Sequence, residues 1–187
     1  MRKIKVLTFI AVLAVCGRVF AGKIAFTEAG ASYCNVIDPS YISNNDTGVF
    51  DTASFDAKAG CEPIMWTDIY AGAAFHFYMD RSNWQNFYTF FPLYIGCRVN
   101  IFPELIVYPS IFAEYGLAFA NHHYVTGPTT ERDAAWDASY YNFGIGINWN
   151  VTDIATLCLY AERPSLSNDS GPEIHIFKSG FAWKIFY

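Results

Sequence analysis

The chain has 187 residues, a formal charge of −5 and a hydrophobic fraction of 53%, and 19% of its residues are aromatic. An acidic chain without a basic stripe repels nucleic acid, so we expect no nucleic-acid partner. A composition this apolar requires either a large core or many side chains that face lipid.

The first 21 residues have the layout of a secretory signal peptide. Three basic residues among the first five precede the apolar run Val6 to Val15, which is shorter than the roughly 17–25 residues of a spanning helix. Val19-Phe20-Ala21 offers a cleavage site, although Leu13-Ala14-Val15-Cys16 also resembles a lipoprotein signal. We predict a signal peptide over 1–21 and one domain over 22–187. Four of the twelve bases and none of the seventeen acids lie in the signal, so that domain carries a formal charge of −9.

Beyond the signal, apolar and polar residues alternate in segments of about ten residues, which is typical of transmembrane β-strands. In the clearest segment, 87–100, Leu93 and Ile95 fall on one face, and Gly96 and Arg98 fall on the other. We expect the apolar face to contact lipid and the other face to fill a polar interior. In chain order, the predicted strands are 23–34, 53–62, 69–80, 87–100, 105–120, 140–149, 154–163 and 174–187.

The links between these segments alternate in length. One side receives the links 35–52, 81–86, 121–137 and 164–173, and the other receives 63–68, 101–104 and 150–153. Long links outside and short turns inside are expected of bacterial outer-membrane barrels, which satisfy all backbone groups without an open edge. We therefore predict an all-β, eight-stranded, antiparallel up-and-down transmembrane β-barrel with long extracellular loops and short periplasmic turns. Its predicted location is the bacterial outer membrane.

The inward positions of the predicted strands carry charges of both signs. An eight-stranded barrel has an interior that side chains can fill, and buried charges are tolerated when they are paired. We expect a salt-bridge network that plugs the lumen, with a narrow polar conduit as the alternative. Arg98 with Glu114, and Glu28 with Lys184, are the expected pairs. The predicted network is Glu28, Asp56, Lys58, Glu62, Arg98, Glu114, Glu162, Lys178 and Lys184.

The C-terminal segment 178–185, Lys-Ser-Gly-Phe-Ala-Trp-Lys-Ile, resembles the signal read by the barrel-assembly machinery, and the chain ends on an aromatic residue. The whole pattern resembles the eight-stranded outer-membrane barrels, a group that includes the OmpA transmembrane domain, OmpX and OmpW. Segment 108–117 is similar to a strand of the OmpW-type barrels. The resemblance implies outer-membrane lipid and the assembly machinery as partners. The implied assembly signal comprises Gly180, Phe181, Trp183, Ile185 and Tyr187.

The sequence shows no arrangement typical of an enzyme or a metal site. Barrel enzymes that deacylate lipid A place His and Ser two residues apart on one strand, whereas Phe177 stands two residues after His175. His122 and His123 lie in the predicted third long loop and match no metal-ligand spacing. We expect no catalytic activity, no metal and no cofactor.

Four cysteines follow the signal peptide, and an even number in an oxidising compartment allows disulfides. The predicted topology places Cys34 near the outer rim and Cys61 near the inner rim. Cys61 and Cys97 fall on strands that are not neighbours. We predict that these three and Cys158 are free thiols.

Two functions remain open. The OmpW resemblance implies a narrow pore or uptake barrel for small molecules, including hydrophobic ones. The alternative is a surface adhesin or structural protein of the OmpX type, with a plugged lumen and loops that bind host surface ligands. The predicted outer loops carry nine acids against two bases, which disfavours polyanionic ligands.

Overall fold

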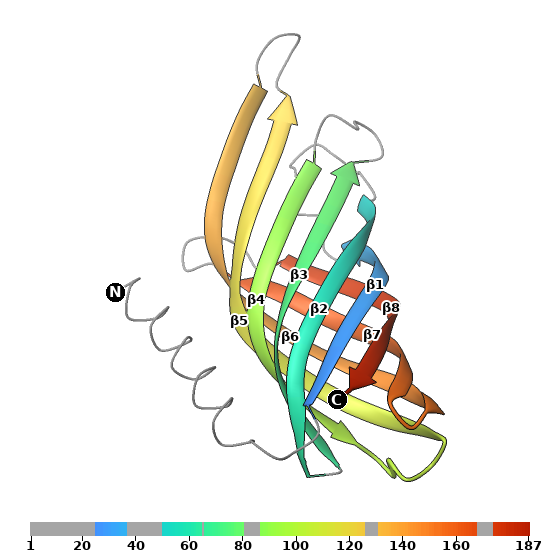
Figure 1. Ribbon diagram of the computed structural model, residues 1–187. Helices are drawn as coiled ribbons and strands as arrows, with labels where there is room; N and C mark the ends of the chain where they lie inside the picture. The colour runs from blue at the N-terminus through green and yellow to red at the C-terminus, as the bar shows by residue number, and fades with distance from the viewer. Residues whose placement is uncertain (1–24, 37–49, 65, 81–86, 126–130, 168–173) are drawn as a thin grey trace.

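The computed structural model describes residues 25–36, 50–64, 66–80, 87–125, 131–167 and 174–187 (Figure 1). Each of its eight strands pairs antiparallel with the next, and β1 pairs with β8, so the sheet closes into a barrel in chain order. This confirms the predicted architecture. The strands are β1 (Ala25–Val36), β2 (Phe50–Ile64), β3 (Thr67–Asp80), β4 (Phe87–Asn100), β5 (Val107–Val125), β6 (Glu131–Thr152), β7 (Ala155–Ser167) and β8 (Ile174–Phe186).

Among the described residues, no helix is long and apolar enough to cross a membrane.

Alternation along each strand separates an outer face from an inner face. On β4, Phe91 and Ile95 are exposed on the outside, whereas Tyr94 and Arg98 are buried inside. Successive side chains of a strand point to opposite sides of the sheet, so one register fixes the contents of the lumen and of the lipid-facing surface together. The outward positions of β4 to β8 form an exposed belt of Phe, Ile, Leu, Val and Trp side chains.

The barrel has two different ends. We call the end with the links 65–66, 101–106 and 153–154 the turn end, and it also holds the start of β1 and the end of β8. The opposite end, where 37–49, 81–86, 126–130 and 168–173 connect the strands, is called the loop end.

At the loop end, the predicted bounds of two long loops are wrong. β5 continues to Val125 and β6 starts at Glu131, so most of the predicted loop 121–137 is strand. β7 likewise runs on to Ser167, into the predicted loop 164–173. Polar and small residues in these segments indicated loops. Pairing with a neighbouring strand overrides the weak preference of such residues for β-structure. The predicted loop 35–52 lies mostly outside the described residues, and the predicted signal peptide 1–21 and link 81–86 lie wholly outside them.

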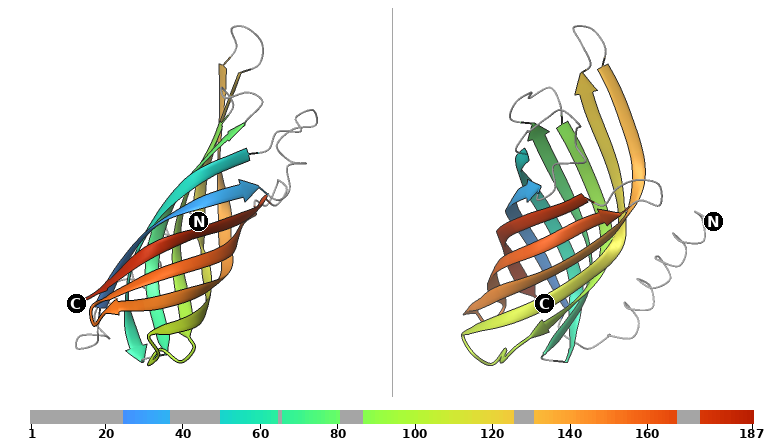
Figure 2. Two further views of the ribbon diagram at one scale, coloured as in Figure 1. Left: turned by 90° about the vertical axis from the view of Figure 1, so that its right-hand side faces the viewer. Right: turned by 180° about the vertical axis from the view of Figure 1, so that it is seen from behind.

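Because of this extra length, β5 and β6 form a taller side of the barrel at the loop end, which we call the high wall. The β6–β7 pairing stops at Ser139 opposite Ser167, while the β5–β6 pairing continues to Val125 opposite Glu131. β5 and β6 therefore reach well past β7 and β8 (Figures 1 and 2). On the outward face of this extension, Asn121 and Asp137 are exposed beyond Phe119 of the lipid-facing surface.

The links at the turn end are short and are held by backbone hydrogen bonds. Phe102 has a φ of 56°, and the backbone N–H of Leu105 donates to its carbonyl at 3.0 Å. A left-handed non-glycine residue occurs mostly in tight turns. The N–H of Asn100 donates to the carbonyl of Trp66 at 2.8 Å, which joins this turn to the one between β2 and β3.

Two glycines make room for aromatic rings inside the lumen. A Cβ on Gly96 would lie 2.5 Å from the Tyr70 ring, and a Cβ on Gly72 would lie 2.6 Å from the Tyr94 ring. Both pairs are cross-strand partners on β3 and β4, Tyr70 with Gly96 and Gly72 with Tyr94. The two tyrosines therefore fold back over the facing glycines, and this close approach requires the missing Cβ.

Candidate functional site: a charged lumen

The structure places the nine predicted charged residues inside the barrel. Eight of them are at most 6% exposed, and the side chain of the ninth, Glu62 at the turn end, is 16% exposed. Sequence reasoning missed Asp68, which is fully buried, because it fell in the predicted turn 63–68. β3 actually begins at Thr67, so Asp68 is its first inward residue.

Near the turn end, two cations hold three carboxylates. The Arg98 guanidinium donates to both oxygens of Glu28, at 2.7 and 2.8 Å, and also lies 3.5 Å from Asp68. The Lys184 ammonium contacts Asp68 at 2.8 Å and Glu62 at 3.1 Å. Two-point Arg–carboxylate contacts are among the stronger hydrogen bonds in proteins, so this end of the lumen is firmly cross-linked.

In the middle of the lumen, Lys58 joins two carboxylates. Its ammonium lies 2.9 Å from Glu114 and 3.6 Å from Glu28. The hydroxyls of Tyr70 and Tyr140 donate to the two oxygens of Glu114, at 3.0 and 3.3 Å. The carboxylate of Glu114 therefore has partners on three other strands, β2, β3 and β6.

The third part of the network lies closest to the loop end. The Asn142 amide donates to Glu114 and to Glu162, at 2.9 Å each. The Lys178 ammonium lies 2.6 Å from Glu162 and 3.2 Å from Asp56. The Tyr160 hydroxyl donates to Asp56 at 2.9 Å.

These contacts correct both expected pairs. Arg98 holds Glu28 rather than Glu114, and Lys184 holds Asp68 rather than Glu28. Glu28 and Lys184 do face each other in the β1–β8 register, but the long lysine reaches across the lumen to β3. Long side chains in a narrow closed barrel meet partners on the far wall, which pairwise register cannot predict.

The contacts form one unbroken series, which we call the lumen chain. It contains six carboxylates and four cations, bridged by one asparagine. Because each charge is buried beside a partner of opposite sign, the chain fits a packed plug better than an open water-filled path. In order from the turn end, its members are Glu62, Lys184, Asp68, Arg98, Glu28, Lys58, Glu114, Asn142, Glu162, Lys178 and Asp56.

Aromatic rings surround the cations of the chain. The Lys184 ammonium lies 4.2 Å from the centroid of the Phe26 ring and 4.4 Å from that of Phe186. Lys58 lies 5.1 Å from the Tyr70 ring centroid and 5.2 Å from that of Phe112. Desolvated cations gain from such ring faces, so these contacts add to the stability of the plug.

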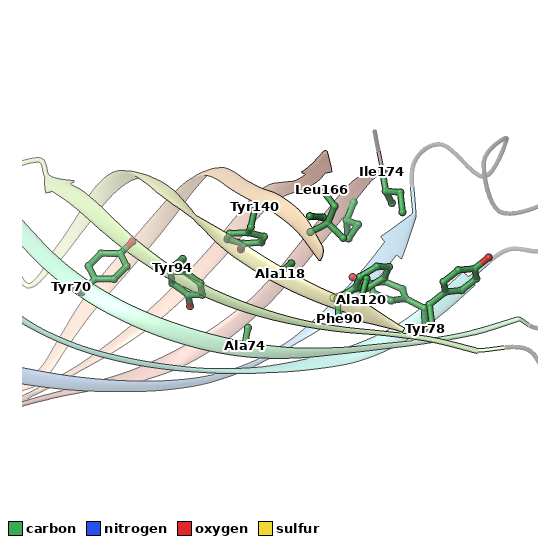
Figure 3. Packing of buried hydrophobic residues seen from close by; sticks show 14 of the residues in the cluster. Tyr70, Ala74, Tyr78, Phe90, Tyr94, Ala118, Ala120, Tyr140, Leu166 and Ile174 are labelled. Carbon is green, nitrogen blue, oxygen red and sulfur yellow. The ribbon is translucent and has the colours of Figure 1, made fainter. Parts of the chain in front are cut away.

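The half of the lumen nearer the loop end is mainly apolar, although Ser32, Ser54 and His76 are also buried there, whereas a polar interior was expected throughout. Phe90 of β4 and Ala120 of β5 lie on one side of this half, with Leu166 of β7 and Ile174 of β8 on the facing side (Figure 3). All four are buried. The signal was present in the sequence, because the inward register of β4 there reads Tyr88, Phe90 and Pro92 before the first charge at Arg98.

A serine–histidine contact exists that the search along single strands missed. The Ser165 Oγ on β7 lies 2.9 Å from His175 Nδ1 on β8, its partner in the register. Ser165 is only 4% exposed, and the contact joins the two strands near the loop end. His123, expected in a loop, lies on β5 and stacks on Phe87, with ring centroids 4.8 Å apart. His122 is likewise part of β5 rather than of a loop.

The C-terminal residues of the implied assembly signal face both sides of β8. Phe181, Trp183 and Ile185 are exposed on the lipid-facing side, whereas Gly180 packs against Ser32 of β1. The Tyr187 hydroxyl lies 2.9 Å from Thr27 Oγ1, which also helps to close the barrel at β1.

The four cysteines of the described strands are free, as predicted. Cys34 and Cys158 are buried in the lumen, whereas Cys97 is exposed on the outer face. Within the same described ranges, no group of three or more His, Cys, Asp or Glu side chains could hold a metal ion.

No protein-family model and no curated protein matches the chain. Solved structures do match, and Neisserial surface protein A (NspA) superposes with a TM-score of 0.65 at 12% identity, covering 87% of this chain and 97% of that one. Ail, the attachment invasion locus protein of Yersinia pestis, gives a TM-score of 0.55 at 8% identity over 88% and 99%.

A major outer membrane protein from Thermus thermophilus gives a TM-score of 0.54 at 9% identity, over 87% of this chain and 99% of that one. At such low identities the likeness concerns the fold alone, and it does not single out OmpW-type barrels. The chain has the fold of the eight-stranded bacterial outer-membrane β-barrels, and its exposed apolar belt fits that membrane.

Proposed function

We propose that the protein is a closed outer-membrane barrel that does not conduct, and that it acts at its loop end by binding a partner outside the cell. The observation that carries this proposal is the lumen chain, which links the walls of the barrel from Glu62 to Asp56 without a break. It favours the plugged, OmpX-type alternative over the pore.

Passage of a solute would require several of these contacts to open together. Separating Arg98 from Glu28, or Lys58 from Glu114, leaves charges that are almost inaccessible to water. Breaking one buried pair typically costs about 3–5 kcal/mol, and at least two would have to part. Spontaneous opening is therefore rare.

The loop end offers the contact surface. The β5–β6 extension rises above the lipid-facing belt, and its exposed polar residues include Asn121 and Asp137. A long strand pair that stands in water is a rigid platform for recognition. Ail, one of the barrels with this fold, is described as an attachment invasion locus protein, which is consistent with an adhesive role here.

Two measurements test the proposal. Cells that display the wild-type chain should attach to a host-cell layer, and a variant with residues 122–134 replaced by a two-residue turn should lose attachment while still migrating as a folded barrel. Liposomes that contain the refolded wild type should show no swelling in small sugars. Unchanged attachment of the shortened variant would argue against the surface role, and rapid swelling would argue against the plug.

A second candidate is uptake of small hydrophobic molecules, favoured by the apolar half of the lumen near the loop end (Figure 3). A fluorescent apolar probe should then bind the refolded barrel, and Ala118→Trp, which fills this half, should reduce binding. Equal binding by wild type and variant would count against uptake.

We also propose that the chain is not an enzyme. The Ser165–His175 contact has a nucleophile that is almost inaccessible, so an acylating reagent should leave Ser165 unmodified in the folded barrel.

A further inference from the structure

A cavity of about 470 Å³ opens at the turn end, beyond the last member of the lumen chain. It lies between the link 101–106 and the end of β6 with the link 153–154, and the ends of β2 and β8 complete its wall. We propose that this cavity binds the headgroup of a phospholipid that ends in a primary ammonium. The inference does not depend on whether the barrel conducts or adheres.

The cavity is held open by hydrogen bonds between its two turns. The backbone N–H of Asn150 donates to the Ile106 carbonyl at 2.8 Å, and its side-chain amide donates to the Leu105 carbonyl at 3.3 Å. The Thr156 hydroxyl donates to the side-chain oxygen of Asn150 at 2.8 Å. Asn150 thus fixes one turn against the other, and the cavity exists before any ligand arrives.

The polar lining suits a cation. Glu62, Glu104 and Asp153 line the cavity, and none of the lining residues is Lys or Arg. Glu62 is held by Lys184, which leaves the other two carboxylates without a cation among the described residues. An ammonium carries three donors and no acceptor, which matches a wall of carboxylates.

A tyrosine side chain faces the same cavity. Tyr108 is 4% exposed as a residue and lines the cavity, and no hydrogen bond to its hydroxyl is formed within the described strands and turns. The hydroxyl can therefore donate to or accept from a ligand in the cavity. It can pair with either the ammonium or the phosphate of a bound headgroup, so a zwitterionic ligand fits better than a bare cation.

The rim of the cavity joins the lipid-facing surface. Leu105, Ile106 and Val151 line the cavity and are exposed, with Ile106 as high as 70%. Directly next to them, Val107 and Trp149 face each other across the β5–β6 register on the outside of the barrel. A ligand with its charge in the cavity can therefore keep its acyl chains in the membrane leaflet at this end.

The experiment compares two headgroups with the same acyl chains. The full barrel is refolded in vesicles of equal parts phosphatidylethanolamine and phosphatidylcholine, released in mild detergent, and its retained lipids are counted by native mass spectrometry. We expect phosphatidylethanolamine to be retained roughly tenfold over phosphatidylcholine, as for one charge-assisted hydrogen bond that a trimethylammonium cannot donate. The double variant E104Q/D153N should lose this preference.

The matched control is D133N/D137N, which removes two acids from β6 at the loop end and should keep the preference. Equal retention of the two lipids by the wild type would overturn the proposal, as would an unchanged preference in E104Q/D153N. A basic peptide, trilysine, provides the last arm. If trilysine binds wild type but not E104Q/D153N while neither lipid is preferred, the cavity serves a peptide and the lipid proposal is wrong.

Discussion

Replacing Arg98 by Met tests the lumen chain at its most tightly held point. The guanidinium makes two short hydrogen bonds to Glu28 and a longer contact with Asp68, and Arg98 and Glu28 are both almost fully buried. The variant leaves Glu28 with only Lys58, at 3.6 Å. Loss of one partner of a buried ion pair costs about 3–5 kcal/mol, and the remaining lysine should place the loss near the lower value.

The assay is unfolding of the refolded barrel in vesicles, followed by tryptophan fluorescence in denaturant and by migration of unheated and heated samples on a gel. For a domain of this size, a loss of about 3 kcal/mol lowers the midpoint of thermal unfolding, read from the heated samples, by roughly 6–12 °C. The double variant R98M/E28L should recover most of the stability, because removing both partners leaves no unpaired charge. Arg163→Met, at an exposed outward position, is the control. If R98M unfolds within about 0.5 kcal/mol of the control, the reasoning about a paired, dry lumen is refuted.

Three further predictions concern packing, thiols and the membrane boundary. Gly96→Ala should destabilise the barrel by roughly 1–3 kcal/mol in the same unfolding assay, because its Cβ would lie 2.5 Å from the Tyr70 ring; wild-type stability would contradict the contact. A small maleimide should label Cys97 in the folded barrel and the two lumen cysteines only after unfolding, as read by mass spectrometry; early labelling of the lumen thiols would indicate an open lumen. Ile145→Lys should cost about 2–4 kcal/mol and Asn121→Lys almost nothing, because only the first faces lipid; equal costs would contradict the assigned boundary.

The sequence predicted the fold well because every strand shows the alternation of apolar and polar residues that sets which side chains face lipid and which face the lumen. Once Leu93 and Arg98 are assigned to opposite faces, the period of two fixes every other residue of β4, and the same holds for the other strands. The inward charges follow from that register alone.

Partners across the lumen and the ends of strands could not be predicted in the same way. Arg98 and Glu28 lie on strands that are not neighbours, so their contact depends on the closure of the barrel and on side-chain length. The extension of β5 and β6 depends on their pairing with each other, and polar residues near 121–137 gave no local sign of it. The turn-end cavity could not be predicted either, because Asn150 and Tyr108 come to line one cavity only in the folded barrel.

The central claim is that the lumen chain closes the barrel, and single-channel recording in planar bilayers tests it most directly. Wild-type protein, shown to be folded by its migration on an unheated gel, should give no steady conductance in molar salt. The variant K58A/R98A, which removes the two cations that hold Glu28 and Glu114, should give a measurable current or repeated openings. A stable wild-type conductance that these substitutions leave unchanged would contradict the account.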